Sequence, residues 1–181
     1  MSRLLAIVFA LATSITIAQT NCNCYAVRTN PDTPPLALRL WNLEKVNDEN
    51  VVNFFPQLYS DSEETRVFYF QVITNAMTVS DGAASEGLGY EAAALVQNDL
   101  AHFTSFFTTN ECFDPIDIRT WAFCVFTEVQ IESDPSSIRR DVKSLQRSLA
   151  KNARKLSKED RLIAALFNDY LEIAVQTGYP K

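Results

Sequence analysis

The stretch that decides the fold is residues 136–155, which read SSIRRDVKSLQRSLAKNARK. Its apolar side chains recur at helical spacing and continue just past its end; they are Ile138, Val142, Leu145, Leu149 and Leu156. Most of the positions between them are lysine, arginine or serine. Such a pattern predicts an amphipathic helix with one side in a hydrophobic core and the other side in water.

Similar apolar spacing predicts helices on both sides of this stretch. The expected helices cover residues 36–46, 48–59, 60–77, 91–108, 118–131 and 157–176, and residues 80–89 are expected to form a loop. One run, residues 67–73, is rich in β-branched and aromatic side chains and would also suit a strand. The residues before it favour a helix, because a capping box can form there, from Ser60 with Glu63 or from Asp61 with Glu64.

The composition supports a helical protein. Hydrophobic residues make up 47% and charged residues 21% of the chain, which is typical of a globular domain. Glycine occurs only four times, which disfavours an all-β fold because the tight turns between strands usually need it. We therefore predict an all-α fold, a single disulfide-tied bundle of five to seven helices with an extended N-terminal arm.

The first residues have the pattern of a cleavable export signal. Arg3 precedes an unbroken apolar run at residues 4–12, and the small residues Thr16 and Ala18 suit cleavage before Gln19. The apolar run is much shorter than the ~20 residues that cross a bilayer, and no later stretch is long and apolar enough. We therefore expect a secreted, extracellular protein without a membrane span. Its parts would be a signal peptide at 1–18, an arm at 19–35 that carries Cys22 and Cys24, and a helical domain at 36–181.

All four cysteines follow the expected signal; they are Cys22, Cys24, Cys112 and Cys124. Thiols tend to oxidise outside the cell, and a bond between Cys22 and Cys24 would close a strained ring. We therefore expect each of these two to pair with one of Cys112 and Cys124, and the sequence leaves the choice open. A zinc site is disfavoured because the spacing of Cys22 and Cys24 is short and the chain has a single histidine. No metal or cofactor is expected.

Charge is segregated along the chain. Residues 19–134 hold 17 acidic and 5 basic residues, whereas residues 135–161 hold 9 basic and 3 acidic residues. Six of these basic residues follow helical spacing opposite the leucine stripe; they are Arg140, Lys143, Arg147, Lys151, Arg154 and Lys158. They could bind an anionic surface, such as lipid headgroups, a sulfated polysaccharide or an acidic protein, or they could form a solvated side of the helix. Nucleic acid is not an expected partner, because the net charge is −6 and the chain is expected to be exported.

The sequence contains no enzyme motif that stands out. It lacks a Gly-x-Ser-x-Gly elbow, a phosphate-binding loop and a dinucleotide fingerprint. Asp99 and His102 are three residues apart on one expected helix, and they are the one candidate pair for an extracellular hydrolase. A surface pair beside the phenylalanine stripe explains them more simply. We therefore predict that the protein is not an enzyme, and we assign no catalytic residue.

Aromatic residues are plentiful, with 12 phenylalanines, 6 tyrosines and 2 tryptophans. Four of them could line a cavity for an apolar ligand or could fill the core; they are Phe103, Phe106, Phe107 and Trp121. The leading hypothesis is a secreted, non-enzymatic binding protein. It either carries an apolar small ligand between helices or presents the basic side of a helix to an anionic partner. The alternative is an extracellular structural or interaction protein without a small-molecule ligand, and the oligomeric state is left open.

Overall fold

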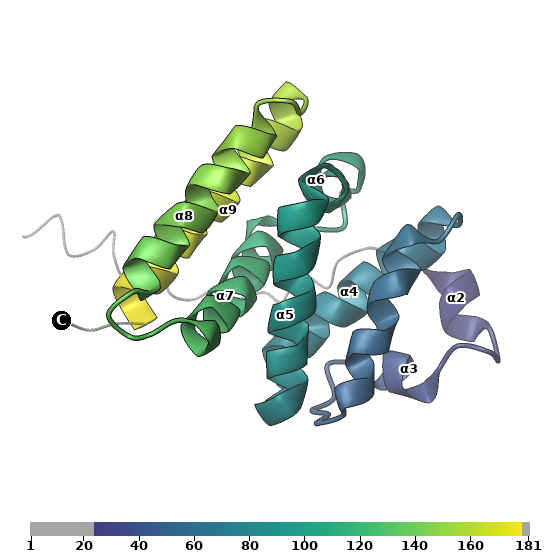
Figure 1. Ribbon diagram of the computed structural model, residues 1–181. Helices are drawn as coiled ribbons and strands as arrows, with labels where there is room; N and C mark the ends of the chain where they lie inside the picture. The colour runs from purple at the N-terminus through teal and green to yellow at the C-terminus, as the bar shows by residue number, and fades with distance from the viewer. Residues whose placement is uncertain (1–23, 179–181) are drawn as a thin grey trace, which may run out of the picture.

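The structure, a computed structural model, describes residues 24–178. All the regular elements in this range are helices (Figure 1). In chain order they are α2 (Tyr25–Thr29), α3 (Pro35–Trp41), the 3-10 helix η1 (Glu49–Tyr59), α4 (Glu63–Val79), α5 (Gly82–Asn98), α6 (Leu100–Thr109), α7 (Pro115–Glu132), α8 (Ile138–Ala153) and α9 (Lys158–Gly178). The predicted all-α class is confirmed.

The described range holds nine helices, which is more than the five to seven expected. The two shortest are α2 and α3, with five and seven residues. Helix α2 lies inside the segment that was expected to be an extended arm, so this prediction is wrong for residues 25–29. The segment folds because it finds partners: the Ala26 N–H donates to the Glu64 carboxylate at 2.8 Å, and the Arg28 guanidinium lies 5.2 Å from the centre of the Trp41 ring.

Helix α4 is the central helix of the bundle. All ten residues from 67 to 76 are buried, since α2, α3, η1, α5 and α7 all contact this helix. A helix that is surrounded in this way needs apolar residues on all sides, which is why the same run would also suit a strand. Its N-cap is Ser62, whose hydroxyl accepts a hydrogen bond from the Thr65 N–H at 3.3 Å. The cap is therefore Ser62 and not Ser60 or Asp61.

The loop expected at residues 80–89 is wrong, because α5 begins at Gly82. Gly82 has φ +58°, a left-handed conformation that suits the tight turn between α4 and α5. The small residues of this segment allow close contact between helices. At Gly89, a Cβ atom would lie 3.3 Å from the carbonyl oxygen of Cys124 and 3.3 Å from the Cβ of Glu128, both on α7. Here a run of small residues marks close packing.

The single helix expected at residues 91–108 is two helices that meet at Asp99. This residue has φ −140° and ψ 59°, which is not helical, and the chain changes direction there. Its carboxylate accepts a hydrogen bond from the backbone N–H of His102 at 3.2 Å and so caps the start of α6. The break gives α6 its own direction across α9, which it contacts.

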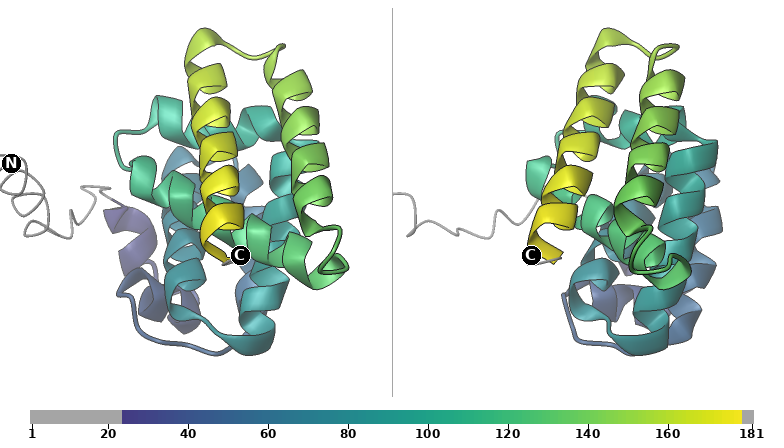
Figure 2. Two further views of the ribbon diagram at one scale, coloured as in Figure 1. Left: turned by 90° about the vertical axis from the view of Figure 1, so that its left-hand side faces the viewer. Right: turned by 60° about the vertical axis from the view of Figure 1, so that its left-hand side comes forward.

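Helices α8 and α9 form an antiparallel hairpin that lies against α7 (Figures 1 and 2). A short turn at residues 154–157 joins the two helices. The apolar side of α8 is buried as predicted, with Ile138, Val142, Leu145, Leu149 and Ala153 in the core. The opposite side of α8 is left to the solvent, and this side carries the basic residues.

The expected framework of two disulfides is wrong. Cys24 is buried, Cys124 is half-buried, and both are free thiols, so Cys24 pairs with neither Cys112 nor Cys124. Burial raises the pKa of the Cys24 thiol to about 11 and that of the Cys124 thiol to about 12. Both side chains therefore act as small apolar groups. Of the pairings considered, Cys22 with Cys112 remains; Cys22 lies outside the described residues, and this bond stays a prediction.

The expected signal peptide at residues 1–18 also lies outside the described residues. Between residues 24 and 178, the structure contains no helix with the length and the apolar character that a membrane span requires. Secretion stays a prediction.

Candidate functional site

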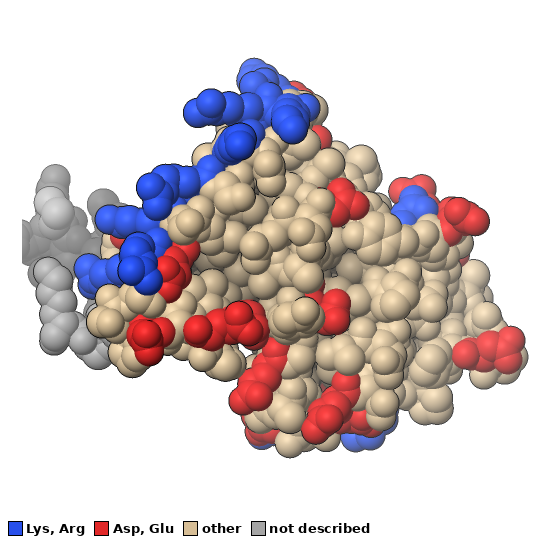
Figure 3. Space-filling view, in the orientation of Figure 1, with Lys and Arg blue, Asp and Glu red and all other residues tan. Residues whose placement is uncertain are grey.

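The basic residues of the α8–α9 hairpin lie together on one surface of the molecule. We define the basic face as the six residues predicted above, all of which are exposed: Arg140, Lys143, Arg147, Lys151, Arg154 and Lys158. In Figure 3, lysine and arginine side chains follow the edge of the molecule along α8 up to the end of the hairpin, whereas acidic side chains gather over the other helices. Charges that are separated along the sequence are therefore also separated in space.

The basic face is not the side of a single helix. Its first four residues lie on α8, whereas Arg154 is the C-cap residue of α8 and Lys158 is the first residue of α9. Helix α8 ends at Ala153, and the chain then turns, with the Lys155 N–H donating to the carbonyl oxygen of Asn152 at 3.1 Å. The last two cations therefore lie at the tip of the hairpin.

Most cations of the basic face have no acidic partner among the described residues. The one salt bridge on this face joins Arg140 Nε to Asp141 Oδ1 at 3.1 Å. Hydrogen bonds, first from Ser137 and then from Arg140, hold the pKa of the Asp141 carboxyl below its ordinary value. The Arg147 side chain is held along the helix, because its Nε donates to the carbonyl oxygen of Lys143 at 3.1 Å. The face is thus a row of charges that the protein itself hardly neutralises.

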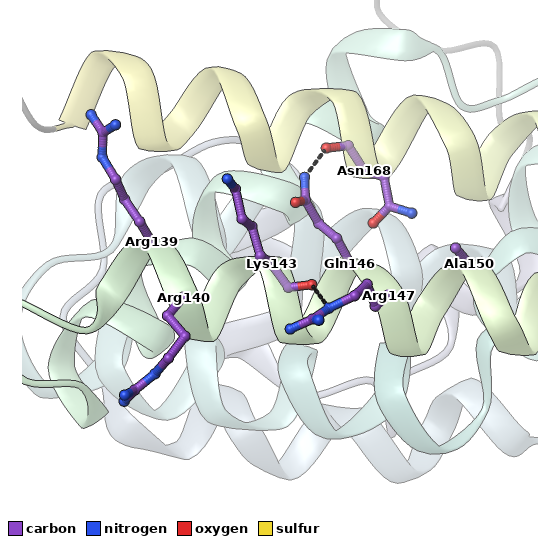
Figure 4. Close-up of a pocket in the computed structure, with 7 residues that line it drawn as sticks. All are labelled: Arg139, Arg140, Lys143, Gln146, Arg147, Ala150 and Asn168. Atoms are coloured by element: carbon purple, nitrogen blue, oxygen red, sulfur yellow. Dashed lines mark hydrogen bonds between the residues drawn. The ribbon is translucent and has the colours of Figure 1, made fainter.

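An open groove of about 670 Å³ runs along the hairpin beside the basic face (Figure 4). We call it the basic groove; its lining residues are Arg139, Arg140, Lys143, Gln146, Arg147, Ala150 and Asn168. Gln146 Nε2 donates to the backbone carbonyl oxygen of Asn168 at 2.9 Å and so links α8 to α9. The side-chain oxygen of Asn168, Oδ1, is buried and has no hydrogen-bond partner among the described residues. Four cationic residues and Asn168 therefore line the same groove.

Half of the predicted basic residues line the groove, namely Arg140, Lys143 and Arg147. The lining residues that sequence reasoning missed are Arg139, Gln146, Ala150 and Asn168. Arg139 could have been found, since it is basic and adjacent to Arg140. Asn168 could not, because it comes 22 residues after Gln146 and meets it only when α9 folds back along α8.

The four aromatic residues considered as a cavity lining pack on one another around Phe70 of α4. The ring centre of Phe70 lies 4.1 Å from that of Phe106, 4.8 Å from Trp121, 5.4 Å from Phe107 and 6.3 Å from Phe103. Three of the four are almost fully buried, with exposed fractions of 0% for Phe103, 3% for Phe106 and 0% for Trp121. Rings at these separations fill the space between the helices, as in a packed core.

The candidate hydrolase pair does not have the geometry of a carboxylate that orients an imidazole. Asp99 accepts from the backbone N–H of His102, as described above, while His102 Nε2 lies 2.8 Å from the carbonyl oxygen of Leu58. The ring of Tyr59 stacks on the imidazole with 4.5 Å between the ring centres. His102 and Tyr59 border a second pocket, of about 430 Å³. The imidazole joins α6 to η1.

The basic groove is the feature from which a function can be inferred. Within residues 24–178, no three or more histidine, cysteine, aspartate or glutamate side chains gather closely enough to hold a metal ion. Comparison of the chain with protein-family models, curated proteins and solved structures found no match in any of the three. The chemistry of the groove's own residues is therefore the basis of the proposal below.

Proposed function

We propose that this chain is a secreted, non-enzymatic binding protein that holds a polyanionic partner on its basic face and in its basic groove. The observation that carries the proposal is the row of exposed cations beside the groove, most of which have no acidic partner among the described residues. Stable protein surfaces usually mix charges of both signs. A concentrated row of one sign suits a partner of the opposite charge, which it attracts and orients.

Binding of this kind is electrostatic and depends on salt. Successive cations on α8 are three or four residues apart, which places their Cβ atoms about 5–6 Å from each other. That separation is shorter than the screening length of about 8 Å at physiological ionic strength. Several cations therefore act on one stretch of the partner at the same time, and their combined attraction weakens as salt is added.

The other functions considered have less support. A carrier of apolar ligands needs a cavity, whereas Phe103, Phe106 and Trp121 are buried against Phe70. A hydrolase would need the Asp99 carboxylate to orient the His102 ring, whereas Asp99 accepts from the backbone N–H of His102 and the ring Nε2 is bonded to a backbone carbonyl oxygen. A structural protein without a ligand would present the same cations to solvent alone, and the retention test below distinguishes it from the proposed function.

The test is retention on immobilised heparin at low salt. We expect the wild-type protein to be retained and to elute as salt is raised. The double variant Arg147→Glu/Lys151→Glu should elute at much lower salt, because it reverses two charges in the middle of the basic face. The matched control is Lys45→Glu/Arg119→Glu, which makes the same change in net charge at two exposed positions outside the hairpin. Equal elution of the two double variants, or no retention of the wild type, would contradict the proposal.

A further inference from the structure

We infer that two copies of this chain pair through the outer side of α9, with the two α9 helices antiparallel. The surface that would make the contact is the outer stripe, which we define as Leu162, Leu166, Asp169 and Ile173. None of these residues belongs to the basic face or lines the basic groove. The inference therefore goes beyond the proposed function, and either of them can fail while the other holds.

Helix α9 has apolar residues on its outer side as well as on its core side. At 3.6 residues per turn, the outer stripe lies opposite the residues that α9 buries in the core. Leu162 is 63% exposed and Ile173 is 41% exposed, and Leu166 between them is half-buried. In the left view of Figure 2, α9 (yellow) lies on the outside of the molecule, and none of the helices between residues 24 and 178 covers it. Within the described residues, these side chains are therefore left without a covering element. The residues buried on the core side are Ala164, Phe167, Leu171, Ala174 and Val175.

The spacing of the outer stripe suits contact with a second helix along its length. The steps from Leu162 through Leu166 and Asp169 to Ile173 are four, three and four residues, the alternation found where two helices pack side by side. Leu162 and Ile173 lie about 16 Å apart along the helix. A two-fold axis midway between Leu166 and Asp169 places Leu162 of each copy opposite Ile173 of the other. The same surface then contacts itself, as in a symmetric dimer.

Charges beside the outer stripe favour a second copy as the partner and set its direction. Arg161 and Glu172 lie on the same flank of the stripe, because eleven residues are close to three full turns. Neither forms a salt bridge with the residues that the structure describes. The antiparallel pair brings Arg161 of each copy beside Glu172 of the other. A parallel pair would bring like charges together at both positions, which is unfavourable.

Asp169 keeps the pair weak. Its side chain is exposed at the middle of the outer stripe. The two-fold axis that pairs Leu162 with Ile173 brings the Asp169 carboxylates of the two copies close to each other, where they repel. Only Leu162, Leu166 and Ile173 of each copy supply apolar contact, which is typical of a small interface that forms and separates readily. We therefore expect a reversible dimer that is populated at high protein concentration.

The first test is sedimentation equilibrium of the full chain over a wide range of concentration. We expect the wild type to pass from monomer to dimer. Leu162→Glu should raise the dissociation constant about a hundredfold, since each dimer loses two leucine contacts and each contact contributes about tenfold. The matched control is Tyr90→Glu on α5, which places the same charge at a side chain that is 60% exposed. This control should dimerise as the wild type does.

The second test addresses the direction of the pair. Arg161→Glu should weaken the dimer about fivefold, because two attractive pairs become repulsive. Arg161→Glu/Glu172→Arg exchanges the two charges and should restore the wild-type dissociation constant. A role of Arg161 within its own chain would not lead to this recovery.

The third test is a gain of affinity. Asp169→Leu should tighten the dimer about tenfold, because it removes the repulsion and extends the apolar contact. Adding Leu162→Glu to it should abolish the gain, which separates specific pairing from general stickiness.

Three outcomes would overturn the inference. The first is a wild type that stays monomeric at every concentration, whether or not the outer stripe binds lipid vesicles. The second is a dimer that Leu162→Glu weakens no more than Tyr90→Glu does, since a different surface would then form it. The third is failure of the charge exchange to restore what Arg161→Glu loses.

Discussion

His102 Nε2 lies 2.8 Å from the backbone carbonyl oxygen of Leu58, which is 44 residues earlier in the chain. Because a carbonyl oxygen can only accept, Nε2 carries a proton and donates it in this hydrogen bond. The contact joins α6 to the end of η1, and the ring of Tyr59 covers the imidazole. The single histidine of the chain therefore has a structural role.

Replacement of His102 should lower stability without affecting polyanion binding. His102→Ala removes the hydrogen bond and the stacking partner of Tyr59, so we expect the free energy of unfolding to fall by about 1–2 kcal/mol. His102→Gln keeps an N–H donor on the side chain and should lose less. Denaturant unfolding gives the stability of both variants. A His102→Ala variant that is as stable as the wild type would contradict this role.

Asp117 should make the protein less stable as the pH rises. Burial raises the pKa of its carboxyl from 3.8 to about 6 in the folded state. Between these two values the folded state binds more protons than the unfolded state, so the free energy of unfolding decreases with rising pH. After solvent screening, this contribution is about 1–2 kcal/mol.

The variant that tests this is Asp117→Asn. The amide can still accept the hydrogen bond that Asp117 Oδ2 accepts from the Asp114 N–H at 2.9 Å, but it does not titrate. The stability of the wild type relative to the variant should therefore fall between about pH 4 and pH 6. The measurement is denaturant unfolding of both proteins at several pH values. If the free energies of unfolding of the two proteins change in parallel over this pH range, Asp117 is not the source of the pH dependence.

Phe70 should be among the most sensitive positions in the core. It is fully buried, and it stacks on Phe106 and Trp121 at 4.1 and 4.8 Å. Phe70→Ala would leave a cavity at the centre of the aromatic cluster, and we expect a loss of about 3–5 kcal/mol. Phe123→Ala is the matched control, because this ring is half-buried on α7 and should cost clearly less. Thermal or denaturant unfolding measures both, and similar losses would mean that the cluster is not the core described here.

The cysteines offer a direct test of the covalent structure. We predict one disulfide, between Cys22 and Cys112, and two free thiols, at Cys24 and Cys124. The thiol pKa values of about 11 and about 12 keep both thiols protonated at pH 8, so they should react slowly with an alkylating reagent until the protein unfolds. Mass spectrometry before and after alkylation counts the disulfide-bonded cysteines and the free thiols. Two disulfides, or rapid labelling of the folded protein, would contradict the structure.

Some helices could be predicted from the sequence because they bury one apolar side, and a buried side gives the apolar residues a regular helical spacing. Helix α8 is such a case, since its apolar stripe at Ile138, Val142 and Leu145 is buried as the spacing predicts. The first half of α5 was not predicted because its residues are small, and small residues mark a loop as readily as a close helix contact such as that at Gly89. The break at Asp99 could not be predicted for a related reason. A helix cap inside an apolar pattern leaves the spacing of the apolar residues unchanged.

The candidate site also has one part that could be predicted from the sequence and another part that could not. The cations of α8 follow local spacing, and local spacing is visible in a sequence. The groove also depends on Asn168, which approaches Gln146 only through the fold of the hairpin. The packing of the aromatic rings was equally out of reach, because the number of phenylalanines does not tell whether their rings meet. In the structure they meet around Phe70.

The separation of charge also bears on how many molecules could share one polymer. A molecule held by its hairpin would turn its other helices outward, and residues 19–134 carry 17 acidic and 5 basic residues. A coated polyanion would therefore stay negative on its outside. Neighbouring molecules would repel one another along the polymer, so that occupancy would level off before the polymer is covered. Salt would then act in two opposite directions, loosening each molecule from the polymer while allowing its neighbours to come closer.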